Sequence, residues 1–194
     1  MIILASQSPI RRTLLISTGL SISAISPLID EATIKLANQE QAPEDLAMTL
    51  ASAKAINVSS NHPNDIIIAA DQVLAFGGTT YNKANNLDEA RAQLRLMRGH
   101  THHLHTSVAC AHQHHMTFSH STLCTMTMRP FTDEFLENYI AREGAGLLET
   151  VGNYKIEGQG LQLFDCIDGD YFSILGLPLL PLLSYLRRDG YLPQ

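Results

Sequence analysis

Two serines and two arginines lie close together near the beginning of the chain, in the segment Ser6-Gln7-Ser8-Pro9-Ile10-Arg11-Arg12. A strand, a tight turn and a helix N-terminus would bring backbone N–H groups to these side chains. The positive end of a helix favours anions, and the arginine fork matches phosphate oxygens. The segment therefore predicts a phosphate site with contacts from Ser6, Ser8, Arg11 and Arg12. The alternative is a capped helix whose arginines face solvent.

A carboxylate follows the most apolar strand of the chain. Residues 66–70 form an unbroken apolar run, which is typical of a strand buried on both faces, and Asp71 comes directly after it. Carboxylates at the C-terminal end of a buried strand commonly face a cleft, where they bind Mg²⁺ or activate water. The alternative is an aspartate in an ordinary turn.

Four further charged residues could complete a phosphate and metal site if the fold brought them to Asp71: Asp30, Glu31, Lys54 and Lys83. Taken singly, each is also compatible with a surface charge, because charged side chains are rarely buried without a partner.

A histidine-rich stretch between residues 100 and 120 is the one unusual composition: His100, His102, His103, His105, His112, His114, His115 and His120. Imidazole is a common metal ligand, so a metal site is one interpretation. Alternate residues of a strand point to opposite faces, however, and the spacing fits no zinc motif. A solvated hairpin is the interpretation that the spacing favours.

Hydrophobic periodicity and capping residues predict alternating strands and helices, and hence an α/β fold with a mixed sheet. Strands are expected at 2–5, 66–70 continuing through 73–76, 79–82, 101–111, 116–128, and near 161–166 and 171–175. Helices are expected from Pro9 to about Thr18, at 43–58, 87–98 and 132–142, and after Pro178. Residues 144–160 are expected to be mostly loop, and Gly77-Gly78 is expected to turn a hairpin.

The bulk composition limits the class of protein. The chain has 194 residues, 45% of them hydrophobic and 16% charged, with a net charge of -6. These values favour one domain over 1–194, or two closely joined lobes, and disfavour nucleic acid as a partner. Three widely spaced cysteines suit a reducing compartment. No apolar stretch is long enough for a membrane span, so we expect a cytoplasmic protein with no membrane partner.

The segment from Ile3 to Arg12 closely resembles LASxSPxRR, the opening signature of the Maf family of nucleotide pyrophosphatases. Further resemblances follow in the family's order along the whole chain. They are Asp30-Glu31, Lys54-Ala55, Ala70-Asp71, Lys83, the GxTHxxxT pattern of Gly99, Thr101, His102 and Thr106, the loop Gly152 to Gly158, and Gly176-Leu177-Pro178-Leu179. Several spaced motifs are far more specific than any single one. Ala84 departs from the family's usual proline.

The resemblance implies a mixed central sheet flanked by helices, in two lobes around a deep cleft, as in Maf and inosine triphosphatase-like proteins. It implies hydrolysis of a nucleoside triphosphate to the monophosphate and pyrophosphate, a house-cleaning reaction of nucleotide metabolism that needs Mg²⁺ or Mn²⁺. A homodimer is plausible by the same likeness. Asp71 is expected to act as general base or to hold the metal with help from Glu31. The triphosphate is expected to contact Ser8, Arg11, Arg12, Lys54 and Lys83.

Three positions distinguish the branches of the family, and here they are Ile10, Gln72 and Glu157. Gln72 and Glu157 resemble the branch associated with 7-methyl-GTP, whose methylated ring is positively charged and can pair with a carboxylate. The branch acting on dTTP and UTP has arginine, threonine and glutamine at these positions. Ile10 departs from the bulky aromatic that is common in the 7-methyl-GTP branch, and an aliphatic side chain cannot stack on the base as a ring does.

Two alternatives of other classes stay open at the level of sequence. A non-catalytic regulator of cell division would bind nucleotides without cleaving them, and a phosphate-release assay separates it from an enzyme. A metal-binding module would retain Zn²⁺ or Ni²⁺ after dialysis and lose it when His102 and His105 are replaced.

Overall fold

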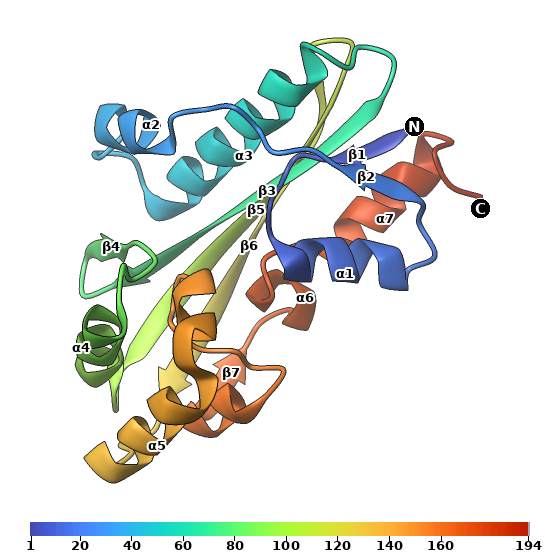
Figure 1. Cartoon of the computed structure of the whole chain (residues 1–194). Helices are drawn as coiled ribbons and strands as arrows, with labels where there is room; N and C mark the ends of the chain where they lie inside the picture. Colours follow the sequence, from blue (N-terminus) through green and yellow to red (C-terminus); the bar gives the residue numbers. More distant parts are fainter. Residues whose placement is uncertain (194) are drawn as a thin grey trace. The chain divides into compact units, whose positions relative to one another are not determined.

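The computed structural model describes residues 1–193 and contains a mixed seven-stranded sheet with flanking helices (Figure 1). The strands are β1 (Ile2–Leu4), β2 (Ile22–Ala24), β3 (Ile66–Phe76), β4 (Thr79–Tyr81), β5 (Thr101–His112), β6 (His115–Met128) and β7 (Phe164–Asp168). Their order in the sheet is β2-β1-β3-β5-β6-β7, with β4 paired to β3. The α/β class with a mixed sheet is confirmed.

Seven α-helices and two 3₁₀ segments connect the strands in the described part of the chain. The helices are α1 (Pro9–Ser17), α2 (Glu31–Ala37), α3 (Pro43–Ser59), α4 (Leu87–Met97), α5 (Asp133–Glu143), α6 (Tyr171–Ile174) and α7 (Leu179–Arg188). The 3₁₀ segments are η1 (Gly144–Glu149) and η2 (Gln159–Leu163). No helix among residues 1–193 combines the length and apolar character that crossing a bilayer requires.

The chain forms two compact units, each assembled from separate stretches. The first unit, the N-terminal unit, comprises Met1–Gln72, His105–Leu123 and Asp170–Gln194. The second, the central unit, comprises Val73–Leu104 and Cys124–Gly169. Hydrophobic periodicity does not locate the borders of this division, because the apolar runs of β3, β5 and β6 continue across them without interruption.

The core of the N-terminal unit has two layers, because the side chains of β3 alternate between the faces of the sheet. Ile66, Ile68 and Ala70 pack with buried residues of α1 and α7. Ile67 and Ala69 pack instead against α3. Figure 1 shows α3 on one side of β1 and β3 and α1 with α7 on the other. The strand β1 pairs in parallel with β2 and with β3. The two layers of the core therefore cover opposite faces of these three strands.

The central unit is built around α4, α5 and η1, which contact one another. Leu94 and Met97 of α4 and Leu136 and Ile140 of α5 are buried. The antiparallel partners β4 on β3 and β7 on β6 supply its strands. The predicted hairpin at Gly77-Gly78 is confirmed, since both glycines adopt the positive φ that such a turn requires.

One expectation about local structure was wrong, and two elements were not predicted. Residues 171–175 were expected to form a strand, but α6 forms there because Asp170 caps the N–H of Ser173. Asp30 likewise caps α2, a helix that hydrophobic periodicity did not reveal. The strand β2 is three residues long and was not predicted. The stretch 144–160 is non-helical from 150 to 158, as expected of a loop, and the 3₁₀ turns of η1 and the start of η2 flank this part.

Candidate active site

Asp71 lies in the middle of β3 and not at the end of a strand, as the sequence had suggested. The apolar run before it and the residues Val73–Phe76 after it form one continuous strand. Its side chain is 10% exposed and lies on the α3 face, which Ile67 and Ala69 share by strand alternation. A carboxylate so deeply placed needs a partner, because burying an unpaired charge is costly.

Lys54 supplies that partner. Its ammonium nitrogen lies 2.5 Å from Oδ1 of Asp71 and 2.9 Å from Oε1 of Glu31. Lys54 comes from the buried face of α3, and Glu31 from the first turn of α2, which Asp30 caps. The structure therefore brings three of the predicted site residues into direct contact, while the Asp30 side chain caps α2 by accepting from the N–H groups of Ala32 and Thr33.

The carboxylates of Glu31 and Asp71 are suited to bind Mg²⁺ together with water and substrate phosphates. Residues 1–193 contain no cluster of three or more His, Cys, Asp or Glu side chains arranged to hold a metal by themselves. Mg²⁺, however, is commonly held by one or two carboxylates together with water and substrate phosphates. Glu31 and Asp71 supply two carboxylates around one ammonium group, which matches that mode.

The predicted phosphate segment folds as expected into a turn and the capped start of α1. Ser8 is the N-cap, and its hydroxyl accepts from the N–H of Arg11 at 3.5 Å. The N–H of Ser8 donates in turn to Oγ of Ser6 at 3.1 Å. Pro9 occupies the first helical position, where its missing N–H is harmless. Ile10 follows, half-buried.

Arg11 and Arg12 have different surroundings. Arg12 is exposed, whereas the Arg11 guanidinium points inward and donates to two backbone carbonyls. Its Nε lies 2.7 Å from the oxygen of Gly176, and its Nη1 lies 2.7 Å from the oxygen of Ala70. Burial lowers the pKa of Arg11, against the opposing attraction of Asp71 and Glu31. Arg11 thus binds protein groups that the sequence did not identify.

The amide of Gln72 is also engaged within the N-terminal unit. Its Nε2 lies 2.9 Å from Oγ1 of Thr106, 2.9 Å from the oxygen of Ser173 and 3.1 Å from the oxygen of Ile174. Because Gln72 follows Asp71 in the same strand, the two side chains leave opposite faces of the sheet. Thr106 and Ser173 were not predicted as site residues, although Thr106 belongs to the GxTHxxxT pattern.

Two predicted site residues, Lys83 and Glu157, belong to the central unit. Both are exposed. The loop that carries Glu157 is tightly fixed at its base. The Tyr154 hydroxyl lies 2.7 Å from Nε2 of His102, and a Cβ on Gly160 would approach the carbonyl oxygen of Lys155 to 2.5 Å. The loop therefore presents Glu157 from a defined backbone.

The histidine-rich stretch forms the predicted hairpin of β5 and β6, which turns at Gln113 and His114 with positive φ. His102 is fully buried, and its burial, with a smaller contribution from the charge of His103, lowers its pKa to about 4. A neutral imidazole is therefore expected at neutral pH. No metal cluster forms from these histidines in the part of the chain that the structure describes.

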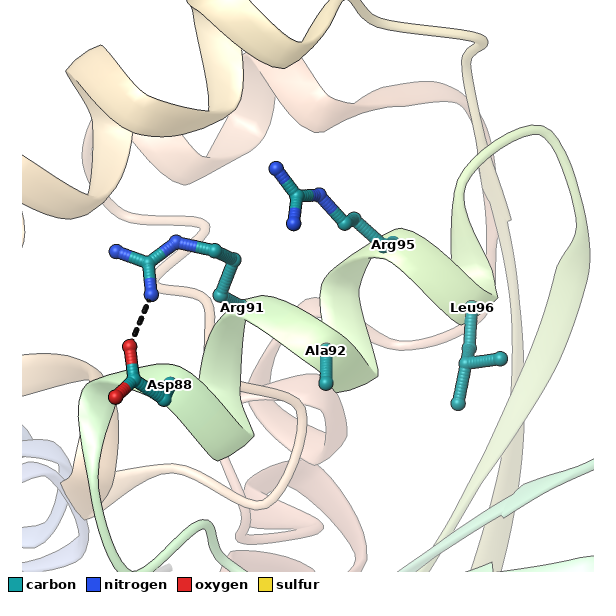
Figure 2. Close-up of a pocket in the computed structure, with 5 residues that line it drawn as sticks. All are labelled: Asp88, Arg91, Ala92, Arg95 and Leu96. Atoms are coloured by element: carbon teal, nitrogen blue, oxygen red, sulfur yellow. Dashed lines mark hydrogen bonds and ion pairs between the residues drawn. The ribbon is translucent and has the colours of Figure 1, made fainter.

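A hollow beside α4 contains none of the predicted site residues. It is lined by Asp88, Arg91, Ala92, Arg95 and Leu96, all on one helix (Figure 2). Arg91 pairs with Asp88 and with Glu137 of α5, and Arg95 pairs with Glu137 as well. These arginines are already neutralised by carboxylates, so the hollow is a poor site for phosphate.

Comparisons with known proteins find similar chains over nearly the full length of this one. A 7-methyl-GTP pyrophosphatase of Brucella abortus biovar 1 (strain 9-941) is 43% identical over 190 residues, covering 97% of this chain and 96% of that protein. A nucleoside triphosphate pyrophosphatase of Caulobacter vibrioides is 44% identical over 191 residues, with coverage of 97% and 96%.

A solved nucleoside-triphosphatase / dITP/XTP pyrophosphatase from Mycobacterium abscessus has a TM-score of 0.41 and 12% identity, covering 99% of this chain and 97% of that chain. That likeness is too weak to indicate anything about function. The family described as Maf-like protein matches residues 1–189. Nearly the whole chain is covered, and relatives above 40% identity agree with the match, so this protein belongs to the Maf family.

Proposed function

We propose that this protein hydrolyses a nucleoside triphosphate to the monophosphate and pyrophosphate, with 7-methyl-GTP as the preferred substrate. The observation that carries the proposal is the buried Asp71 carboxylate, held by Lys54 beside Glu31. The names of the relatives, 7-methyl-GTP pyrophosphatase and nucleoside triphosphate pyrophosphatase, support the same reaction.

In this reaction Asp71 accepts a proton from the water that attacks the α phosphorus, or holds the metal that activates that water. The bond from that phosphorus to the bridging oxygen breaks, and pyrophosphate leaves. Lys54 holds one oxygen of the Asp71 carboxylate in place at 2.5 Å, which orients the other oxygen toward its proton. Charge on the leaving pyrophosphate is offset by the cationic side chains and hydroxyls proposed to bind it, namely Ser6, Ser8, Arg11, Arg12, Lys54 and Lys83.

A bound Mg²⁺ or Mn²⁺ would be held by Glu31 and Asp71 and would neutralise phosphate charge. Glu31 is suited to this role because its side chain is 45% exposed and contacts the Lys54 ammonium group that Asp71 also contacts. Loss of turnover in the presence of a chelator, and its return with added Mg²⁺ or Mn²⁺, tests this part of the proposal.

Of the three positions that distinguish the branches of the family, Ile10 and Glu157 are the ones proposed to contact the base, because the amide of the third, Gln72, is engaged by Thr106, Ser173 and Ile174. An exposed carboxylate on a fixed loop can pair with the positively charged ring of 7-methylguanine. Ile10 offers an apolar surface to the base but no stacking plane. Replacing Glu157 with Gln keeps the shape and removes the charge, so we expect it to reduce the preference for 7-methyl-GTP over GTP.

The substrate is identified by a pyrophosphate-release screen with 7-methyl-GTP, GTP, UTP, CTP, dTTP and ATP in the presence of Mg²⁺ or Mn²⁺. Preference for 7-methyl-GTP supports the proposal in full. Preference for dTTP or UTP keeps the reaction and overturns the assignment of the base. Release from none of them, with folded protein that binds nucleotide, would identify a non-catalytic regulator instead.

The catalytic role of Asp71 is tested by Asp71→Asn, which keeps the side-chain shape and removes the ability to take a proton. We expect kcat to fall at least about a hundredfold, in line with losses of general-base catalysis. Nucleotide affinity, measured by calorimetry, should change little. A variant that retains wild-type turnover would overturn the assignment of Asp71.

A further inference from the structure

Both neighbours of Asp71 in β3 are tied by side chains to the same short segment of the chain. The carbonyl of Ala70 accepts from Arg11, which also holds Gly176, and Gln72 donates to Ser173 and Ile174. We propose that Arg11, Gln72 and Thr106 form a positioning clamp that fixes Asp71 for the reaction. This inference rests on the proposed function, and it gives Gln72 a role other than contact with the base.

The first element of the clamp is the Gln72 amide. An amide NH₂ group has two hydrogens, and three acceptors lie within 3.1 Å of its nitrogen. Both hydrogens are therefore committed to Thr106, Ser173 and Ile174. Since Gln72 and Asp71 leave opposite faces of β3, Gln72 acts on Asp71 through the backbone that they share.

The second element is the Thr106 hydroxyl, which accepts from Gln72 at 2.9 Å and donates to the oxygen of Ser173 at 2.9 Å. Thr106 is fully buried in β5, and a buried hydroxyl in this position costs free energy unless it is hydrogen-bonded. The two hydrogen bonds of the Thr106 hydroxyl orient the Gln72 amide and tie α6 to β5.

The segment held by the clamp is itself rigid. Asp170 accepts from the N–H of Ser173 at 2.7 Å and from its hydroxyl at 2.6 Å. Beyond α6, Gly176 has a φ of 99°, a conformation that favours glycine, and presents its carbonyl to Arg11. The connections form a closed ring: β3 to Gln72, to α6 and Gly176, to Arg11, and back to the carbonyl of Ala70.

A positioning role and a base-contacting role predict different kinetics. A catalytic group displaced by about 1 Å can lose on the order of a hundredfold in rate. Loosening the clamp would lower kcat for every nucleotide by the same factor and leave KM nearly unchanged. Loss of a contact to the base would instead change the ratio of kcat/KM between bases.

The experiment compares Thr106→Val, which keeps the shape and removes the hydroxyl, with Thr106→Ser, which restores it. Gln72→Met, which removes the amide at similar length, is the second test of the clamp. The control is Thr117→Val, the same change at a hydroxyl that bonds Tyr185 and Cys110 away from the clamp. Steady-state kinetics use the three nucleotides that the wild-type enzyme cleaves best, and thermal unfolding confirms that each variant is folded.

We expect kcat to fall about tenfold to a hundredfold in Thr106→Val and Gln72→Met, equally for all three nucleotides. Thr106→Ser should recover most of this loss, and Thr117→Val should keep wild-type kcat. An unchanged kcat in folded Thr106→Val, or a change confined to the ratio between bases, overturns the clamp while the proposed function stands. A wild-type protein that cleaves no nucleotide overturns both.

Discussion

The adjacent residues Arg11 and Arg12 show how much of a residue's role depends on distant contacts. Sequence predicted one function for both, because an arginine at a helix N-terminus commonly meets phosphate. In the structure Arg11 donates to carbonyls 59 and 165 residues away in the chain, whereas Arg12 is exposed. No local pattern records such long-range partners. The proximity of Glu31, Lys54 and Asp71 could be expected only because a family resemblance supplied it.

Arg11→Lys is expected to destabilise the protein by about 1.5 to 3 kcal/mol, the usual range for hydrogen bonds from a charged group. A lysine ammonium on a flexible stem cannot reproduce the fork that spans Ala70 and Gly176. Arg12→Lys, the matched control, should stay within about 0.5 kcal/mol of wild type. Urea unfolding at equilibrium measures both, and equal effects of the two substitutions would contradict the assignment of Arg11 to a structural contact.

His102 predicts a pH dependence of stability. Its pKa is lowered from 6.5 to about 4, so the folded state binds this proton less readily than the unfolded state. The stabilisation is complete above about pH 6.5 and is lost as the pH falls toward 4, by about 3 kcal/mol in total. His102→Gln, which does not titrate, should flatten the fall in unfolding free energy across this window. Parallel curves for the two proteins would refute the prediction.

At the scale of elements, long periodic segments were predictable and short capped ones were not. The helices α3 and α4 have termini within one or two residues of the expected ones, since a proline and an asparagine mark their starts. The helix α6 has four residues, which is too short for periodicity to be visible. Its residues Tyr-Phe-Ser-Ile favour a strand by type, and the capping carboxylate of Asp170 outweighs that preference.

Asp170→Ala is therefore expected to destabilise the protein by about 1 to 2 kcal/mol, as the loss of an N-cap commonly does. Asp170→Asn retains an acceptor for the N–H and hydroxyl of Ser173 and should cost much less. Denaturant titration of the two variants and the wild type measures the difference. An alanine variant as stable as the asparagine variant would show that capping does not hold α6.

At the scale of the whole molecule, each unit is assembled from stretches that are far apart in the sequence. The helix α7 contributes Leu179, Leu182, Tyr185 and Leu186 to the core of the N-terminal unit, although it lies at the other end of the chain. A single apolar core could be expected from composition. The borders between its two units could not, because residue types do not show which strands continue across a border.

Removal of residues 179–194 is expected to abolish cooperative unfolding. Each large side chain taken from a core costs about 2 to 5 kcal/mol, and four such losses reach the total stability of a typical domain. Removal of residues 193 and 194 alone is the control and should leave the thermal transition near that of the full chain. Circular dichroism on heating measures both, and a sharp transition in the shorter protein would contradict the expectation.

The position of Asp71 inside the eleven-residue strand β3 also limits how this protein can diverge in evolution. Inserting or deleting one residue between Ile66 and Ala70 would exchange the two faces of the strand beyond that point. Asp71 would then leave Lys54 and turn to the side that Gln72 now occupies, and a lineage carrying the change would lose both arrangements at once. Descendants of this sequence can replace residues in the segment, but changes of length should survive only outside it.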